Sequence, residues 1–400
     1  MARIAVAHTD LAAKGGGEGV CMTVLEALQD GHEVHLLTLT TPDLEELNRY
    51  FNTDVDPLPV RRAPVVDRAL DLVDVPLYNL RNALLNRHVA RHRDEYDLVV
   101  STDNELSPEP PAVQYVHTPR FGRLVVSKRV GEDGFVDHLY DRLSYRAGGY
   151  DAERIRRGRL LTNSRWMANV VQDVYGVRPR VVYPPVDTSG FDPLPWDERE
   201  DGFVTVGRLA RYKNVDETIR IVDEVRERGH DVHQHVVGPS YDPDYRRELE
   251  AMAADRDHVT IEGELPRADL VELLCTHRYG LHGKRHEHFG MAVAELVAAG
   301  AVAFVPDNGG QRDVVDRRDA LCYRTPGEAV EQIDDVLSNP DRRREVRLDP
   351  ARVEARFGRK RFREEMRSIV REALRDDEID ADRSARSDRR ARRRHDRTEA

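Results

Sequence analysis

Residues 286–295 read His286-Glu287-His288-Phe289-Gly290-Met291-Ala292-Val293-Ala294-Glu295. They place one carboxylate before an apolar helix, which we predict over residues 289–299, and a second carboxylate inside that helix. The helix is apolar on its other faces, which predicts that it is buried. A buried carboxylate is costly unless it is hydrogen-bonded or paired. Glu295 therefore needs a polar partner, and either ligand hydroxyls or an arginine in a structural ion pair would serve.

The length and composition of the chain limit its class. Its 400 residues are enough for two or three domains. It contains no run of about eighteen apolar residues, so no membrane-spanning helix is expected, and its first residues lead into a predicted strand without the pattern of a signal peptide. We therefore expect a cytoplasmic protein. Its three scattered cysteines, Cys21, Cys275 and Cys322, lack metal-binding spacing and are expected to be core thiols.

The charge balance is acidic, with 73 acidic residues against 62 basic ones, of which only five are lysines. This balance suggests a halophile or a GC-rich genome, because salt screens surface repulsion. The last twenty residues reverse the sign, with eight arginines against four acids. We expect a disordered basic tail over residues 377–400. A contact of this tail with anionic lipid head groups or RNA is the alternative.

Strand-like and helix-like segments alternate along the whole chain, which predicts α/β domains with parallel sheets. The first series of predicted strands covers residues 4–8, 33–38, 98–101, 113–117, 160–163 and 180–183, and the second covers residues 203–206, 232–238, 259–262, 279–282, 302–305 and 320–323. A proline-rich connector, residues 184–195, lies between the two series. We predict an N-terminal domain over residues 1–185, a linker over 186–201, a second domain over 202–348 and a C-terminal helix over 349–376.

Two loops at predicted strand ends carry residues suited to a phosphorylated ligand. The glycine-rich loop at residues 14–19 follows the first strand, but it does not match the G-x-G-x-x-G pattern. A Walker A loop is also excluded at Gly283-Lys284, because Arg285 follows in place of serine or threonine. After the first strand of the second domain, Arg208 offers a planar donor fork and Lys213 a point charge for a diphosphate. A flexible turn and a pair of solvated cations are the plain alternatives for these two loops.

Other candidate positions are less specific. His117 ends an apolar strand and either contacts a sugar or caps the strand. Asn163-Ser164 fits a helix N-cap, and the Asp307-Asn308-Gly309-Gly310 loop fits either a turn or a ligand-facing backbone. Three histidines, His282, His286 and His288, lack the H-E-x-x-H arrangement of a zinc protease. No metal site is predicted.

In this order along the chain, the motifs resemble those of the retaining GT-B glycosyltransferases of family 4. The resemblance rests on Glu287 and Glu295 as an E-x7-E element, Gly207-Arg208 with Lys213, Gly16-Gly17-Glu18, and Asn163-Ser164 with Tyr183-Pro184-Pro185-Val186-Asp187. The segments Glu287-His288-Phe289-Gly290 and Tyr115-Val116-His117 are most similar to the α-1,2-mannosyltransferases that extend the dolichol-linked oligosaccharide. The resemblance implies two Rossmann-like domains that face a cleft, with the C-terminal helix packed back on the N-terminal domain.

The resemblance also implies a nucleotide-sugar donor held mainly by the second domain. Glu287 would lie beside the donor sugar, Arg208 and Lys213 would stabilise the departing diphosphate, and Glu295 would bind the ribose hydroxyls. His117 would lie near the transferred sugar, and Gly16 and Gly17 against the phosphates. The remaining donor-binding candidates are Gly263 and Leu265, near the base, with Phe289 and Gly290. No cofactor, metal or nucleic acid is implied, and the best guess for the donor is GDP-mannose.

The acceptor implied by the resemblance is a glycan or a lipid-linked glycan. Because no spanning helix is predicted, a lipid-linked acceptor would require peripheral contact at the inner face of the membrane, for which residues 120–129 are the best candidate segment. A helix packed within the first domain is the alternative for that segment. An NDP-sugar epimerase, a sugar phosphorylase or a non-catalytic nucleotide-sugar-binding protein would be alternatives on the same fold.

Overall fold

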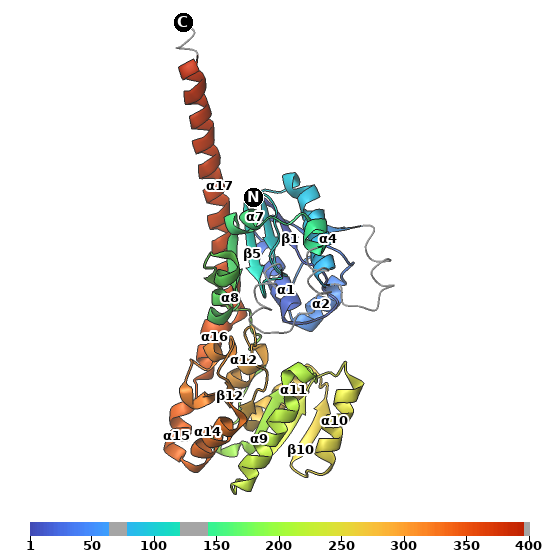
Figure 1. Cartoon of the computed structure of the whole chain (residues 1–400), viewed down its shortest axis with the longest axis vertical. Coiled ribbons are helices and arrows are strands. Elements are labelled where there is room, and N and C mark those ends of the chain that lie inside the picture. The colour runs from blue at the N-terminus through green and yellow to red at the C-terminus, as the bar shows by residue number, and fades with distance from the viewer. Residues whose placement is uncertain (64–77, 121–142, 396–400) are drawn as a thin grey trace. The chain divides into compact units, whose positions relative to one another are not determined.

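The computed structural model describes residues 1–63, 78–120 and 143–395, with side chains up to residue 377. The chain divides into two compact units (Figure 1). Unit 1 comprises residues 1–162, 168–182 and 362–400, and unit 2 comprises residues 163–167 and 183–361. The division between the units thus falls at residues 182–183, within the connection between the two series of strands, and the chain returns to unit 1 for its last segment.

Unit 1 is built on a parallel sheet of seven strands in the described residues, in the order β3-β2-β1-β4-β5-β6-β7. The strands are β1 (Arg3–Ala7), β2 (Glu33–Thr38), β3 (Val60–Arg62), β4 (Leu98–Ser101), β5 (Ala112–Val116), β6 (Arg159–Thr162) and β7 (Arg180–Val181). The helices of this half are α1 (Gly16–Leu28), α2 (Leu44–Phe51), α4 (Tyr78–His92), η1 (Arg93–Glu95), α7 (Ala152–Arg157) and α17 (Arg359–His395). Helix α8 (Arg165–Tyr175) begins in unit 2 and continues in unit 1.

Helices cover both faces of the unit 1 sheet, because side chains alternate between the faces along each strand. Ile4 and Val6 of β1 belong to one core cluster, which also holds Val24 of α1 and Met366 of α17. Ala5 and Ala7 of the same strand belong to a second cluster with Leu85 and Val89 of α4. The expected packing of the C-terminal helix on the N-terminal domain is confirmed, since buried residues Phe362, Met366, Ile369, Val370 and Ala373 join the first cluster.

Unit 2 repeats this architecture with a parallel sheet, which has six strands in the part of the chain that the structure describes, in the order β10-β9-β8-β11-β12-β13. The strands are β8 (Glu200–Val206), β9 (His233–Val237), β10 (Val259–Gly263), β11 (His277–Leu281), β12 (Val302–Pro306) and β13 (Cys322–Tyr323). The helices are η2 (Trp196–Glu198), η3 (Arg211–Lys213), α9 (Val215–Glu227), α10 (Pro243–Ala254), α11 (Arg267–Thr276), α12 (Met291–Ala298), α13 (Gln311–Val314), η4 (Asp319–Leu321), α14 (Pro326–Ser338), α15 (Pro340–Val346) and α16 (Pro350–Phe357).

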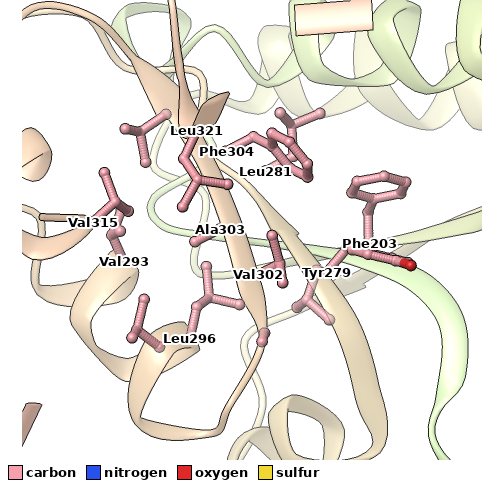
Figure 2. Close-up of a cluster of buried hydrophobic side chains, with 14 of the residues drawn as sticks. Phe203, Tyr279, Leu281, Val293, Leu296, Val302, Ala303, Phe304, Val315 and Leu321 are labelled. Atoms are coloured by element: carbon pink, nitrogen blue, oxygen red, sulfur yellow. The ribbon is translucent and has the colours of Figure 1, made fainter. Parts of the chain in front are cut away.

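The core of unit 2 is centred on β8, β11 and β12. Figure 2 shows Phe203, Tyr279 and Phe304 from these three strands beside Val293 and Leu296 of α12. Gly280 of β11 makes this packing possible, because a Cβ there would lie 2.6 Å from the Leu296 side chain. Helix α12 is therefore fixed against the centre of the sheet, and this contact sets the position of the residues that precede it.

The two parallel sheets were predicted correctly from the sequence, whereas the C-terminal elements have other bounds than those predicted. The single helix expected over residues 349–376 is two helices, because the chain breaks at Gly358 between α16 and α17. Helix α17 continues through the segment that was expected as a basic tail, to His395. Arginine is a good helix former, and neither proline nor glycine follows Gly358 to end the helix.

Two other expectations concern membranes and cysteines. Among the described residues, no helix is long and apolar enough to span a membrane. The segment proposed for membrane contact, residues 120–129, lies outside the described residues except for Arg120. The three cysteines are buried and unpaired with one another, as expected of core thiols.

Candidate functional site

Glycines line the carboxyl-terminal edge of the unit 2 sheet. Gly207, Gly238 and Gly263, at the ends of β8, β9 and β10, have φ angles of 152°, 146° and 71°, values that favour glycine. A Cβ at Gly238 would lie 2.0 Å from the carbonyl oxygen of Gly207, and one at Gly283 would lie 2.6 Å from that of Asn214. The loops at this edge therefore pack backbone against backbone, and the loop after β8 lies beside the loop after β11.

Glu287 lies at this edge, between two lysines. Its Oε2 atom is 2.8 Å from Nζ of Lys213, and its Oε1 atom is 3.0 Å from Nζ of Lys284. Oε1 also accepts a hydrogen bond from the main-chain nitrogen of His288 at 3.1 Å. Nε2 of His282 lies 3.6 Å from Oε2, which is longer than a hydrogen bond. We refer to Lys213, His282, Lys284 and Glu287 as the lysine–glutamate cluster.

The electrostatics of the cluster favour an ionised carboxylate. Burial opposes the ionisation of Glu287, but the neighbouring His282 and the charges of Lys213 and Lys284 outweigh it and hold the pKa of Glu287 well below its usual value. Burial lowers the pKa of Lys284, and the Glu287 carboxylate partly offsets this effect. Burial also lowers the pKa of His282. Two ammonium groups are thus held in place by one carboxylate, in a position that is largely shielded from water.

The backbone before α12 is fixed by contacts within unit 2. Glu287 forms an isolated parallel bridge with Gly309, and its carbonyl oxygen accepts a hydrogen bond from Gly310 at 2.7 Å. Ser164 donates from Oγ to the carbonyl oxygen of His288 at 2.5 Å and accepts from Met167, so its expected N-cap role is confirmed. The glycine pair at residues 309–310 therefore supports the Glu287 loop.

Arg208 occupies a different environment from Lys213. Its side chain is exposed, and its guanidinium lies 6.0 Å from the centre of the Tyr241 ring. Its positive charge contributes to lowering the pKa of Lys284. The structure therefore places Arg208 at the rim of the cluster, close enough to act electrostatically.

Glu295 has a partner within the protein. Its Oε1 atom is 2.6 Å from Nη1 of Arg267, and Nη2 of the same arginine donates to the carbonyl oxygen of Asp187 at 3.2 Å. Burial raises the pKa of Glu295, and Arg267 offsets part of that rise. Of the two partners that the sequence left open for Glu295, the arginine ion pair is present in the structure.

Three other predicted donor-binding positions lie on the same half of the chain. Gly290 has a φ angle of 99° and caps the N-terminus of α12. Leu265, after β10, is half-buried against the core. Phe289 is buried and packs against Tyr183 and Phe357. A donor contact through the Phe289 side chain is therefore incompatible with its position, and only its backbone remains for such a role.

The candidates of unit 1 also come together. Gly16 and Gly17 are the first two residues of α1. A Cβ at Gly17 would lie 3.6 Å from Nε2 of His117, so this glycine faces the predicted histidine. Nε2 of His117 lies 3.0 Å from the carbonyl oxygen of Thr102. Burial lowers the pKa of His117, so its ring is neutral near pH 7. The structure thus groups the three predicted residues of this half at the carboxyl end of the sheet.

Comparisons with known proteins assign the family. Residues 14–189 match Glycosyltransferase Family 4, and residues 188–348 match Glycosyl transferases group 1. The two matches meet at the connector between the sheets and together cover most of both units. The chain belongs to the family 4 glycosyltransferases of the GT-B fold.

Curated relatives of this transferase share a subgroup. The chain is 24% identical over 226 residues to the GDP-Man:Man(3)GlcNAc(2)-PP-Dol alpha-1,2-mannosyltransferase of Caenorhabditis elegans, covering 50% of this chain and 48% of the relative. The protein of the same name from Homo sapiens is also 24% identical, with 51% of this chain and 46% of the relative covered. The match therefore spans about half the length of these relatives.

Solved structures support the fold of the transferase. Anabaena HepE in complex with UDP and glucose has a TM-score of 0.64 at 15% identity, with 92% of this chain and 99% of that chain covered. Sucrose-phosphate synthase from Thermosynechococcus elongatus has a TM-score of 0.67 at 17% identity, with 93% and 99% covered. The structural similarity establishes the architecture, and the low sequence identities leave the substrate open.

Two members of the lysine–glutamate cluster of this transferase, Lys284 and His282, were not predicted as site residues from the sequence. Lys284 was not assigned to the donor site, and His282 was named only as one of several crowded histidines. A usable signal was present for the lysine. The chain has only five lysines against 57 arginines, so two lysines at predicted strand ends of one domain indicate positions where arginine does not substitute.

Proposed function

We propose that this transferase moves a hexosyl residue, with mannose from GDP-mannose as the best candidate, to a glycan or lipid-linked acceptor with retention of configuration. The observation that carries the proposal is the pair of Glu287 contacts, 2.8 Å to Lys213 and 3.0 Å to Lys284, at the glycine-lined edge of a parallel sheet. Ligands of open α/β sheets bind at this edge. The names of the curated relatives support the choice of donor and of a lipid-linked acceptor.

The chemistry of the leaving group explains the two lysines. When the glycosidic bond to a nucleoside diphosphate breaks, negative charge develops on the departing phosphate. Ammonium groups that are already held in place stabilise this charge without reorganisation in the transition state. Glu287 provides the holding contact for both lysines before the donor arrives. Arg208, at the rim, adds a planar donor fork.

Glu287 in this proposal balances charge and lies beside the sugar. Its two ammonium partners favour the ionised form and lower its reactivity as a nucleophile. Retention then follows from attack on the same face that the diphosphate leaves, with the leaving phosphate accepting the acceptor proton. Charge stabilisation would dominate over general-base catalysis.

The direct experiment is a panel of labelled GDP-, UDP- and ADP-hexoses incubated with the purified full-length protein, without added Mg²⁺ or Mn²⁺. We expect slow hydrolysis of GDP-mannose, and faster consumption when a mannosylated polyprenyl-diphosphate acceptor is present. Proton NMR of the product should show that the anomeric configuration of the donor is kept. Turnover of UDP-sugars alone would replace the donor assignment, and an inverted product would contradict retention. A product formed by epimerisation or phosphorolysis would contradict glycosyl transfer.

A further inference from the structure

Three histidine rings meet at the amino-terminal edge of the unit 2 sheet. His233 and His235 lie two residues apart on β9 and therefore share one face of the sheet, and His277 begins β11. One ring nitrogen from each of the three lies within 4.8 Å of the others. Nε2 of His233 is 3.1 Å from Nε2 of His277. The ring centroids lie 4.8 to 5.2 Å apart, and the rings lie at 77° to 85° to one another.

The strand between β9 and β11 leaves space for these rings. Gly202 of β8 pairs with His233 in the sheet register. A Cβ at Gly202 would lie 2.4 Å from Nε2 of His233 and 2.6 Å from Cδ2 of His277. Any residue other than glycine would thus displace two of the three rings, and the cluster depends on this glycine.

Two of the histidines are oriented by hydrogen bonds on their outer nitrogens. Nδ1 of His235 lies 2.7 Å from Oε1 of Glu262, and Nδ1 of His277 lies 2.8 Å from the carbonyl oxygen of Leu273. A carboxylate or carbonyl oxygen can only accept, so each Nδ1 carries the proton. The lone pair of each ring is then on Nε2, where a ligand could use it. Metal-binding histidines are typically held in this way.

We propose that His233, His235 and His277 bind one divalent transition-metal ion of the zinc class. With Zn–N bonds of about 2.0–2.1 Å, two nitrogens of a tetrahedral site are roughly 3.3 Å apart, close to the observed separation of His233 and His277. Oε2 of Glu200 lies 3.5 Å from Nε2 of His233, beside the group of three histidines. The nearby carboxylates of Glu200 and Glu262 supply the negative charge that attracts a cation.

The position of the site indicates a structural role. His233 and His277 stand at the first residues of their strands, whereas Lys213, Lys284 and Glu287 follow the last residues of strands in the same sheet. A metal ion would therefore join β9 to β11 across β8 at the opposite edge from the lysine–glutamate cluster. The side chains of His233 and His235 are 32% and 20% exposed, so an ion can reach them without unfolding of the protein.

The test titrates the full chain with metal ions after treatment with a chelator and dialysis. Calorimetry measures the binding of Zn²⁺, and visible absorption measures the binding of Co²⁺. We expect one ion per chain, the absorption bands of a tetrahedral site, and a higher melting temperature with Zn²⁺. Loss of a carboxylate that orients a metal-bound histidine typically weakens binding by ~10–100-fold, and we expect that effect for Glu262→Gln. His233→Gln should weaken binding at least as much.

Two further variants make the result specific. His230→Gln removes a histidine that is paired with Asp334 outside the cluster, and it should bind Zn²⁺ as the wild type does. Gly202→Ala keeps all three histidines and should still weaken binding, because its methyl group displaces the rings. Circular dichroism of the metal-free variants checks that each is folded. Absence of saturable Zn²⁺ binding by the wild type would overturn the proposal. Equal affinity of the wild type, His233→Gln and Gly202→Ala would also overturn it.

Discussion

Glu287 and Glu295 are the two carboxylates of one motif, eight positions apart, and the protein holds them in opposite ways. Glu287 contacts two lysines, and its pKa lies well below its usual value. Glu295 contacts one arginine, and burial leaves its pKa raised. The comparison teaches that sequence spacing identifies both residues without fixing their environments. We expect Glu287 and its two lysines to control turnover, and Glu295 to control donor binding.

The largest effect is expected from Lys213→Ala. Loss of one preorganised donor to a developing negative charge typically lowers kcat by ~10²–10³-fold, and we expect a fall in this range. Steady-state kinetics with the active donor measures it. Lys360→Ala, which removes an exposed lysine at the start of α17, is the matched control and should keep wild-type kcat. Near-wild-type turnover of Lys213→Ala would contradict the assignment of the cluster.

Arg208→Ala should lower kcat by ~10²-fold, at the lower end of the same range. The reason is that Arg208 is exposed and its charge is better screened than that of Lys213. The same assay at increasing salt tests this explanation. We expect the ratio of wild-type to Arg208→Ala turnover to shrink as salt rises, and a ratio that does not depend on salt would argue for a direct, shielded contact.

Glu295→Gln should raise KM for the donor by roughly tenfold and leave kcat close to the wild-type value. A hydrogen bond to a charged group contributes about 1.5–3 kcal/mol, and a contact with ribose hydroxyls would be the same in ground and transition states. Initial rates over a range of donor concentrations separate the two constants. A fall in kcat with unchanged KM would contradict this role and show that Glu295, like Glu287, controls turnover.

Unfolding in urea should also distinguish the two carboxylates. Glu287→Gln leaves two shielded lysines without a counter-charge, and removing one partner of such a group costs about 3 kcal/mol of the free energy of unfolding. Glu295→Gln leaves Arg267, whose side chain is 43% exposed, so a loss of about 1 kcal/mol or less is expected. Equal losses in the two variants would contradict the difference in environment.

The smallest effect is the pH dependence of these stabilities. The pKa of Glu287 is lowered on folding, so its contribution is present above the unfolded value of about 4.3 and is lost as pH falls. The pKa of Glu295 is raised on folding, so the wild type gains stability relative to Glu295→Gln as pH falls through that raised value. Urea unfolding between neutral and acidic pH should therefore give slopes of opposite sign for the two variants, and slopes of the same sign would contradict the pKa directions.

Hydrophobic pattern predicted the sheets well, because buried parallel strands are continuous apolar segments. Strands β2 and β4 have the predicted bounds, whereas β3 was missed because Val60–Arg62 is short, with two of its residues exposed. The partner of Glu295 was beyond prediction, since Arg267 is 28 residues away on another helix and is one of 57 arginines. Lys284 reaches Glu287 only through the turn between them, which no periodic pattern encodes.

The most direct test of the lysine–glutamate cluster is a crystal structure of the protein with GDP or GDP-mannose bound. The account predicts a phosphate oxygen within about 3 Å of Nζ of Lys213 and of Nζ of Lys284, with Glu287 beside the sugar position. A diphosphate bound elsewhere, with both lysines still paired only to Glu287, would contradict it.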